Sequence, residues 1–234
     1  IFGNNLTTNG SGVLTTDGTE AAGVYLENIN NSNVNYNNIL SKNGDGIIFH
    51  ATFGNRMLNN NITTNGTIGA DGYGFNRNNS LNDVVSGGNV ISQGKGEGIS
   101  FTIAAHNLTF YNLSITTIKS EGKGILFGAG AGGTNASFFD SFINASHPSS
   151  FDVDIRSSPG TLNFTNVTLA NNNINFNAGA SALFNRHWYV DSYVNWSNGS
   201  VASNVNLTAY NRTGGVAFSV LTGSDGRIAR QTVL

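Results

Sequence analysis

The sequence contains no cysteine and only two prolines, Pro148 and Pro159. The lack of cysteine excludes disulfide bonds and thiolate metal sites. Charged residues make up only 10% of the chain, with 11 basic and 13 acidic side chains and a net charge of −2. Because no basic stripe is available to neutralise phosphates, we expect no nucleic-acid partner. No stretch approaches the roughly 18 consecutive apolar residues of a membrane helix, so no membrane span is expected.

The chain starts at Ile1 and shows no basic and then apolar leader, which suggests a processed or excised piece. Its abundant residues are glycine, at 30, and asparagine, at 38. Both tolerate a left-handed backbone and favour tight turns. Few segments have a helical pattern. The composition therefore predicts an all-β protein with many turns.

A repeat organises most of the chain, and its central copies are spaced 26 residues apart. Four segments read Gly-(Ile/Tyr)-x-Phe, and they end at Phe49, Phe75, Phe101 and Phe127. The glycines of these segments are Gly46, Gly72, Gly98 and Gly124. In the same frame, the first copy ends at Leu26 and the last at Val153. A fixed period of this size predicts stacked coils, since one repeat cannot bury its apolar residues alone.

Stacking predicts how equivalent side chains meet. Adjacent strands lie about 4.8 Å apart, so the four phenylalanines would form an interior aromatic ladder. A second inward column would run from Val24 to Phe151. A second apolar strand follows in each repeat, and asparagines near its end could form a hydrogen-bonded amide ladder. The asparagines predicted to form this ladder are Asn38, Asn61, Asn89, Asn112 and Asn166.

The pattern Gly-Ile-x-Phe followed by Asn-x-Ile resembles the right-handed parallel β-helix repeat of pectate-lyase-like and related surface proteins. The resemblance covers about residues 23–185, and residues 1–185 are predicted to form this domain. It implies an all-β fold but no single function, because the fold hosts lyases, hydrolases, adhesins and structural proteins. The polygalacturonase-like signatures Asn-Thr-Asp, Asp-Asp, Gly-His-Gly and Arg-Ile-Lys are absent from the sequence. No catalytic residue is therefore assigned.

Residues 186–234 form a second predicted domain with a different pattern. Short strands alternate with turns such as Asn198-Gly199 and Asp225-Gly226. The stretch from Val194 to Ile228 resembles the start of a carboxypeptidase-regulatory-like β-sandwich. Such a module usually has more strands, so we expect an incomplete sandwich segment. An open sheet edge accepts a strand from a neighbour, which favours self-association into a polymer or lattice.

The sequon Asn-x-Ser/Thr occurs 16 times, about twice the roughly seven expected by chance. This excess favours an N-glycosylated exterior, although a β-helix could also use Asn and Thr in its turns. Asn112 and Asn166 are expected to point inward and are left out of the predicted sites. The predicted glycosylation sites are Asn5, Asn9, Asn30, Asn61, Asn65, Asn78, Asn107, Asn135, Asn144, Asn163, Asn195, Asn198, Asn206 and Asn211.

Three acidic residues, Asp45, Asp71 and Glu97, each precede a repeat glycine, and Lys123 takes this position in the next repeat. Stacked carboxylates could bind Ca²⁺, which is the only cofactor considered, or act as acid and base on a sugar. The alternative is that they are solvated residues of Asp-Gly turns.

Asp152, Asp154 and Arg156 alternate along one predicted strand and share a face. They could form a small polar site or an exposed salt-bridged strand. The four histidines show no metal-ligand spacing, so no metal site is assigned to them.

These patterns lead to one main functional hypothesis. It is a structural extracellular glycoprotein of a surface layer or filament, and the composition resembles that of archaeal surface proteins. The second hypothesis is a protein that binds or cleaves polysaccharides along an outer groove with Asp45, Asp71 and Glu97. The third is an adhesin at the cell surface.

Overall fold

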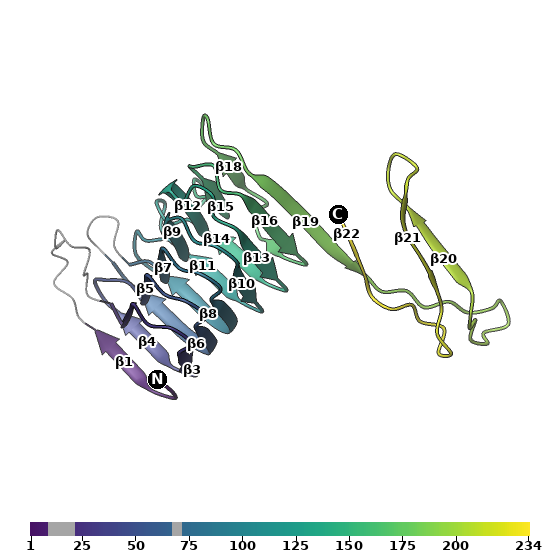
Figure 1. Cartoon of the computed structure of the whole chain (residues 1–234), viewed down its shortest axis with the longest axis horizontal. Helices are drawn as coiled ribbons and strands as arrows, with labels where there is room; N and C mark the ends of the chain where they lie inside the picture. Colours follow the sequence, from purple (N-terminus) through teal and green to yellow (C-terminus); the bar gives the residue numbers. More distant parts are fainter. Residues whose placement is uncertain (9–21, 67–71) are drawn as a thin grey trace. The chain divides into compact units, whose positions relative to one another are not determined.

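The computed structural model describes residues 1–8, 22–66 and 72–234, except for the side chain of Asn78. Every regular element among these residues is a β-strand (Figure 1). The chain divides into two compact units, Ile1–Asn185 and Arg186–Leu234. The first unit is a stack of coils in which parallel strands of successive coils pair with one another. The predicted parallel β-helix is therefore confirmed.

One wall of the β-helix is a parallel sheet of seven strands in the order β18-β15-β12-β9-β7-β5-β2. Each coil contributes one strand to this wall. Most of these strands have an apolar residue at both inward positions, which explains why the strands are buried. The strands are β2 (Val24–Glu27), β5 (Ile47–His50), β7 (Phe75–Asn78), β9 (Ile99–Ile103), β12 (Ile125–Gly130), β15 (Val153–Ile155) and β18 (Ile174–Phe176).

The other walls belong to a sheet of thirteen strands with two arms. The long strands β6 (Arg56–Thr64) and β8 (Val84–Ser92) run through both arms. The first arm also holds β3 (Asn33–Asn35), β10 (Leu108–Tyr111), β13 (Ala136–Phe139), β16 (Thr161–Thr165) and β19 (Leu183–Val190). The second arm also holds β1 (Asn5–Thr8), β4 (Asn38–Ser41), β11 (Ser114–Thr117), β14 (Phe142–Ala145) and β17 (Thr168–Leu169).

The bend between the two arms is made by one residue per coil in the left-handed conformation. Asparagine and aspartate tolerate positive φ better than other residues with a side chain, which accounts for much of their use in this chain. The φ angles at this bend lie between 48° and 67°. The bend column consists of Tyr36, Asn59, Gly87, Asn112, Asp140 and Asn166.

The predicted ladder of four phenylalanines is wrong at one position. Strand pairing places Phe75 opposite Ile47 and Ile99, in the other inward column. Arg77 takes the place between Phe49 and Phe101. The reason is the coil length, because the coil that ends at Phe75 is longer than its neighbours.

The coil length varies throughout the stack. Strand pairing aligns Ile47 with Phe75 and Ile125 with Val153, and both of these coils are longer than the coil from Ile99 to Ile125. The glycine equivalent to Gly98 is therefore Gly74 and not Gly72. The last predicted frame is also shifted, since Ile155, and not Val153, lies opposite Phe127. In this wall the predicted alignment holds for the step from Leu26 to Phe49 and for the step from Ile99 to Ile125.

The aromatic stacking that remains is regular. The rings of Phe101 and Phe127 are stacked with centroids 4.7 Å apart. A longer ladder lies in the first arm, where Phe110, Phe138, Phe164 and Phe184 follow one another at 4.5, 4.8 and 4.7 Å. Each spacing matches the distance between paired strands, because the side chains of equivalent residues lie directly above one another.

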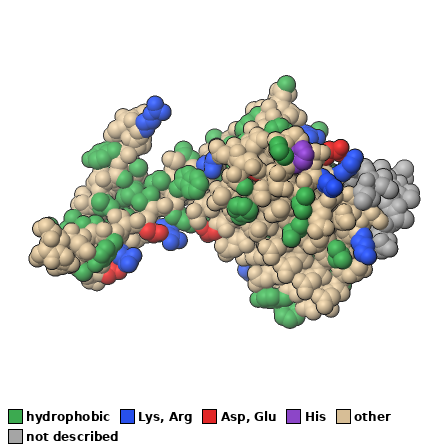
Figure 2. All heavy atoms as spheres, turned by 180° about the vertical axis from the view of Figure 1, so that it is seen from behind, with side chains coloured by type: hydrophobic (Ala, Val, Ile, Leu, Met, Phe, Trp, Pro, Cys, Tyr) green, Lys and Arg blue, Asp and Glu red, His purple; other side chains and the backbone are tan. Residues whose placement is uncertain are grey.

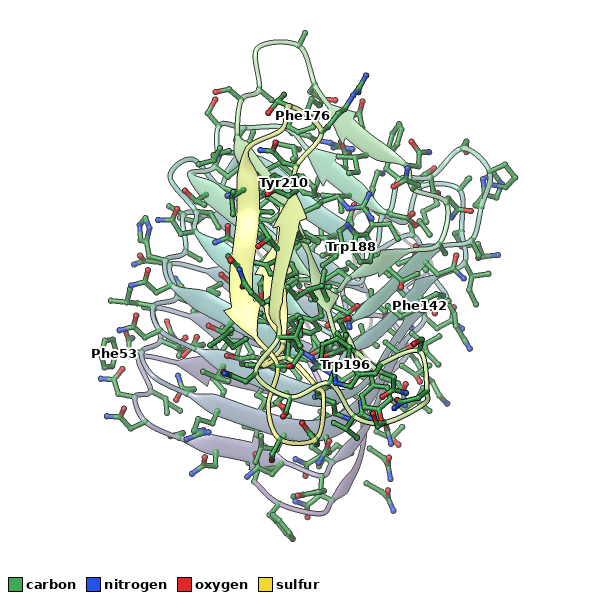
Figure 3. The ribbon with its side chains drawn as sticks, turned by 90° about the vertical axis from the view of Figure 1, so that its right-hand side faces the viewer. Phe53, Phe142, Phe176, Trp188, Trp196 and Tyr210 are labelled. Carbon is green, nitrogen blue, oxygen red and sulfur yellow. The ribbon has the colours of Figure 1, made fainter. Side chains whose placement is uncertain are left out.

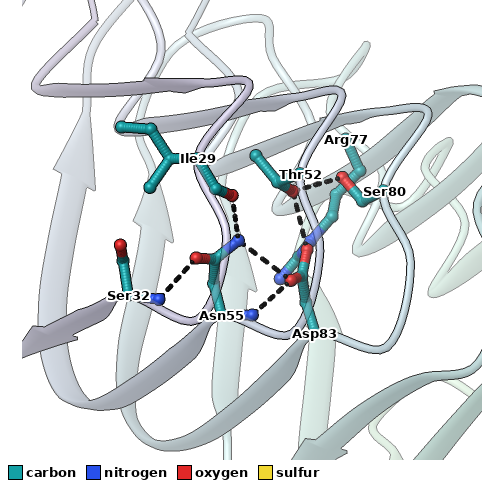
Figure 4. Close-up of polar contacts among 7 residues, drawn as sticks. All are labelled: Ile29, Ser32, Thr52, Asn55, Arg77, Ser80 and Asp83. Atoms are coloured by element: carbon teal, nitrogen blue, oxygen red, sulfur yellow. Dashed lines mark hydrogen bonds and ion pairs between the residues drawn. The ribbon is translucent and has the colours of Figure 1, made fainter.

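Arg77 is fully buried, and a cluster of polar groups accommodates it (Figure 4). Its Nη1 donates to Asp83 Oδ2 at 2.9 Å, and its guanidinium lies 4.0 Å from the ring centroid of Phe49. Burial lowers the pKa of Arg77 to about 10, and Asp83 opposes that shift. Asp83 also accepts from Thr52 Oγ1 at 2.9 Å and from the backbone N–H of Asn55 at 2.7 Å. A buried charge needs such partners to remain ionised.

The amide ladder is confirmed for three of its five predicted members. The side chains of Asn89, Asn61 and Asn38 donate along the coil axis to Asn61, Asn38 and Asn5 at 3.0, 3.1 and 2.9 Å. Asn112 and Asn166 lie in the bend column instead. A second, buried ladder links Asn37 and Asn60, in which Asn60 Oδ1 accepts both the backbone and side-chain N–H of Asn37 at 3.0 Å.

The second unit has few buried side chains. Strands β20 (Asn206–Tyr210) and β21 (Val216–Leu221) form an antiparallel hairpin, and β22 (Gln231–Val233) pairs with the end of β19. Only Ala202 and Ile228 are buried apolar residues among the described part of this unit. Two sheets packed face to face are not found among the described residues, so the predicted sandwich is not confirmed.

Candidate functional site

The predicted glycosylation sites lie at the surface of the described structure. Asn9 lies outside the described residues, and so does the side chain of Asn78. None of the other twelve asparagines is buried. Nine are exposed, and Asn135, Asn144 and Asn163 are half-buried. Every described member of the set is therefore placed where solvent reaches it.

Two of these sequons have the same local geometry. Asn198 Oδ1 accepts from the backbone N–H and the hydroxyl of Ser200 at 3.0 and 2.7 Å. Asn211 Oδ1 accepts from the corresponding groups of Thr213 at 3.1 and 2.9 Å. These are Asx turns, in which the side-chain oxygen is used locally. The amide nitrogen remains on the outer side of a surface loop.

The expectation that Asn112 and Asn166 point inward is wrong. Both are exposed, because positive φ at the bend between the arms turns their side chains outward. Asn166 Nδ2 donates to Asp140 Oδ1 at 2.7 Å, and Asp140 occupies the same column one coil earlier. The coil register, which sequence spacing alone did not resolve, decides on which side of the wall these residues lie.

The acidic column is not continuous. Because Gly46 is equivalent to Gly74, Asp45 lies in register with Tyr73, while Asp71 lies outside the described residues. The carboxylate of Asp45 is buried and accepts from the backbone N–H of Tyr73 at 2.9 Å and from Asn76 Nδ2 at 2.9 Å. These contacts suit a carboxylate that fixes the loop of the following coil. The Ca²⁺ site stays a prediction.

The carboxyl group of Glu97 is buried, and its pKa is shifted. Its Oε1 lies 3.9 Å from Lys123 Nζ, one coil further on. Burial raises its pKa to about 7, and the positive charges of Lys123 and Arg156 oppose the shift, whereas Asp154 adds to it. The carboxyl is therefore partly protonated at neutral pH, which is the state that a general acid requires.

Asp154 belongs to β15, two strands along the seven-stranded sheet from β9, the strand that follows Glu97. Arg156 Nε donates to its Oδ2 at 2.8 Å, and Asn175 Nδ2 donates to its Oδ1 at 2.8 Å. Asp152 belongs to another contact, since it accepts from the backbone N–H groups of Ala145 and Asn171 at 2.9 Å. The structure thus leaves Glu97 and Asp154 two coils apart, about twice 4.8 Å along the axis, and gives Asp152 contacts of its own.

The histidines do not gather. His50 Nδ1 lies 3.4 Å from Glu27 Oε1, and His147 Nδ1 lies 2.9 Å from Ser149 Oγ. No group of three or more His, Asp or Glu side chains that could hold a metal is found among residues 1–8, 22–66 and 72–234. In the same residues, no helix is long and apolar enough to cross a membrane.

Charged side chains are sparse on the face shown in Figure 2. The hairpin of the second unit has one apolar side and one side with both polar and apolar residues. Its apolar side presents the paired residues Leu207 and Val220 and, two residues on, Ala209 and Phe218. All four are half-buried, although a two-stranded hairpin gains little stability by itself.

The opposite side of the hairpin carries polar residues together with the exposed apolar residues Tyr210, Val216 and Leu221. The hydroxyl of Ser219 lies 3.0 Å from Thr208 Oγ1 and donates to Asn206 Oδ1 at 3.0 Å. Asn206 is a predicted glycosylation site on this side, and Asn211 lies in the turn of the hairpin. A glycan on either residue would leave the apolar side uncovered.

Comparison with known protein families found no match, and neither did comparison with curated proteins or with solved structures. The functional argument therefore rests on the residues and their geometry.

Proposed function

We propose that this chain is a structural glycoprotein of an extracellular surface layer or filament. The observation that carries the proposal is the position of its sequons. Twelve predicted sites with described side chains lie at the surface, on the β-helix and on the second unit. Three described asparagines are buried, Asn37, Asn55 and Asn60, and none of them begins a sequon.

The β-helix supports a structural role in a second way. Its stability comes from ladders that run along the axis, and every coil is tied to the next by backbone hydrogen bonds. Such a stack is a stiff spacer with a regular outside on which glycans can be displayed. The apolar side of the β20–β21 hairpin supplies a surface for association with another copy.

Mass spectrometry of glycopeptides from the native material tests the glycoprotein part. We expect glycans on several of the twelve described sites, with Asn198 and Asn211 among them because their Asx turns present the amide. Native material in which every sequon peptide is unmodified would exclude this function.

A protein that acts on polysaccharides is the second candidate. The observation that favours it is the pair of carboxyl groups on the outer side of the seven-stranded sheet. The raised pKa of Glu97 lets it hold a proton near neutral pH, whereas Asp154 forms an ion pair with Arg156. A protonated acid and an ion-paired carboxylate on one wall are the two kinds of carboxyl group that glycoside hydrolases use.

A panel of acidic and neutral polysaccharides, assayed with and without Ca²⁺, tests this candidate. Cleavage that is lost in Glu97→Gln and retained in Glu121→Gln would establish it. Glu121 is a suitable control because its carboxylate is exposed beside Lys95. Absence of cleavage and binding in the whole panel would leave the structural role alone.

A further inference from the structure

A shallow groove of about 510 Å³ follows the bend between the two arms of the thirteen-stranded sheet. It crosses successive coils, and in three of them it is lined by the bend residue and the start of the second arm. Its lining residues include Asn112, Ser114, Asp140, Phe142, Asn166 and Thr168. Four of these six residues belong to two sequons, Asn112-Leu-Ser114 and Asn166-Val-Thr168.

Of the two sequon asparagines that line this groove, Asn112 has the more accessible side-chain amide, compared with Asn166. It is exposed at φ 50°, and its backbone N–H is already bonded to the carbonyl of Phe139 at 3.0 Å. Its side-chain amide has no hydrogen-bond partner within the described part of the chain. By contrast, one amide hydrogen of Asn166 is used in the bond to Asp140.

The rest of the Asn112 sequon is held in place by the next coil. The backbone N–H of Leu113 donates to Ser141 Oγ at 3.2 Å, and Ser114 pairs with Phe142 in the parallel register. The coil after Asn112 therefore carries an aromatic ring directly beside the sequon, about 4.8 Å along the axis.

Phe142 is unusual for a phenylalanine in this chain. Its side chain begins β14, points away from the core and is 40% exposed, and Figure 3 shows it at the side of the β-helix. An exposed aromatic ring beside carboxylate and amide groups is suited to a sugar. The apolar C–H face of the sugar packs on the ring, while its hydroxyls bond to groups such as the Asp140 carboxylate.

We propose that Asn112 carries an N-glycan and that the first sugars of this glycan lie in the groove against Phe142. This inference rests on the proposed glycoprotein function and adds to it a site that sequence reasoning left out. The groove then serves to hold the chain's own glycan flat along the coil axis. The bound sugars cover an apolar ring that is otherwise exposed to water.

Glycopeptide mass spectrometry of the native protein is the first test. A glycan on the Asn112 peptide is expected. Occupied sequons elsewhere with a bare Asn112 would overturn this inference and leave the proposed function standing. A protein with no glycan on any sequon would overturn both.

A double-mutant cycle tests the contact with Phe142 in protein made by a host that N-glycosylates it. In the wild-type background, Phe142→Ala is expected to lower the thermal midpoint by about 2–4 °C. In the Asn112→Gln background, the same change is expected to have no effect, because the glycan is gone. An equal loss in both backgrounds would show that the ring acts without the glycan and would overturn the contact.

Phe53→Ala provides the matched control. Phe53 is also an exposed phenylalanine, at 41%, and Figure 3 shows it on the side of the β-helix opposite to Phe142. Its replacement should shift the thermal midpoint equally with and without Asn112. If the effect of Phe53→Ala on the thermal midpoint also depended on Asn112, the coupling would not be specific to the groove. That result would contradict the proposal.

Discussion

At the scale of single residues, the central finding is that an arginine replaces a phenylalanine inside the β-helix. The two inward positions of most strands in the seven-stranded sheet are apolar, but β7 carries Phe75 and Arg77. The ion pair of Arg77 with Asp83 lies in the same coil. Asp83 is the charged partner of its Nη1, whereas Nε and Nη2 have no hydrogen-bond partner among the described residues. The guanidinium also packs against the rings of Phe49 and Phe110.

Removal of one partner of this pair should be costly. Asp83→Ala leaves a buried, unpaired guanidinium, so we expect a loss of about 3–5 kcal/mol in the free energy of unfolding. Glu121→Ala, which breaks an exposed pair with Lys95, should lose less than about 1 kcal/mol. Chemical denaturation of both variants checks the difference. Equal small losses would mean that the charge of Arg77 does not depend on Asp83.

The protonation of Glu97 should make the stability of the folded protein depend on pH. Burial raises the pKa of this carboxyl from 4.5 to about 7 in the folded state, so the folded protein binds the proton more tightly than the unfolded chain does. Its contribution to stability is complete below pH 4.5 and is lost as the pH rises through about 7. Glu97→Gln should therefore flatten the decline in stability between these values.

Denaturation curves measured from about pH 4.5 to about pH 8 provide the check. Glu121→Gln is the control, because its carboxylate is 59% exposed, and it should leave the decline unchanged. If wild type and Glu97→Gln show the same slope, Glu97 is not the group responsible.

At the scale of elements, the glycine that precedes five of the seven strands of the seven-stranded sheet is required by packing. A Cβ on Gly98 would overlap with the γ-methyl of Ile115 and lie 2.6 Å from the carbonyl oxygen of Gly124. The same conflict arises at Gly23, Gly46, Gly74 and Gly124, each against a β-branched residue of the second arm. The glycine column thus allows the second arm to pack close to the start of the next strand.

Gly98→Ala should destabilise the β-helix by at least about 2 kcal/mol, because neither the backbone nor the branched side chain can yield easily. Gly132→Ala is the matched control, since a Cβ there meets nothing within 4 Å. Thermal unfolding of the two variants measures the difference. A harmless Gly98→Ala would contradict the packing argument.

The element scale also shows how far the sequence predicts the structure. Glycine and phenylalanine spacing identified the stacked coils, because every coil repeats the same bend and the same buried strand. It failed at Phe75 and Val153, where longer coils shift the frame by two positions. A shift of two keeps the side chain on the same face, so alternation alone gives no sign of it.

The candidate sites were predictable to a smaller degree. Asp45 and Glu97 were found from their place before a glycine, but their partners lie in the next coil and depend on its length. The pairing of Glu97 with Lys123 follows the regular frame, whereas that of Arg77 with Asp83 was missed. Counting from Gly74 would have placed Arg77 in the phenylalanine column.

At the scale of the whole molecule, two surfaces differ in their chemistry. The β-helix presents sequons and polar ladders to solvent, whereas the hairpin presents an uncharged apolar side beside its own sequons. The hairpin alone buries little, so it gains stability when a second apolar sheet face covers it. Another copy offers such a face, and the glycans on Asn206 and Asn211 would not obstruct it.

Sedimentation velocity over a rising concentration series tests the proposed structural role most directly, with wild type compared to Phe218→Asp. Phe218 lies on the apolar side of the hairpin, and Thr208→Asp, on the opposite side, is the control. We predict that wild type and Thr208→Asp assemble as the concentration rises, whereas Phe218→Asp stays monomeric. A wild-type protein that remains monomeric at the highest concentration would contradict the structural, self-associating role.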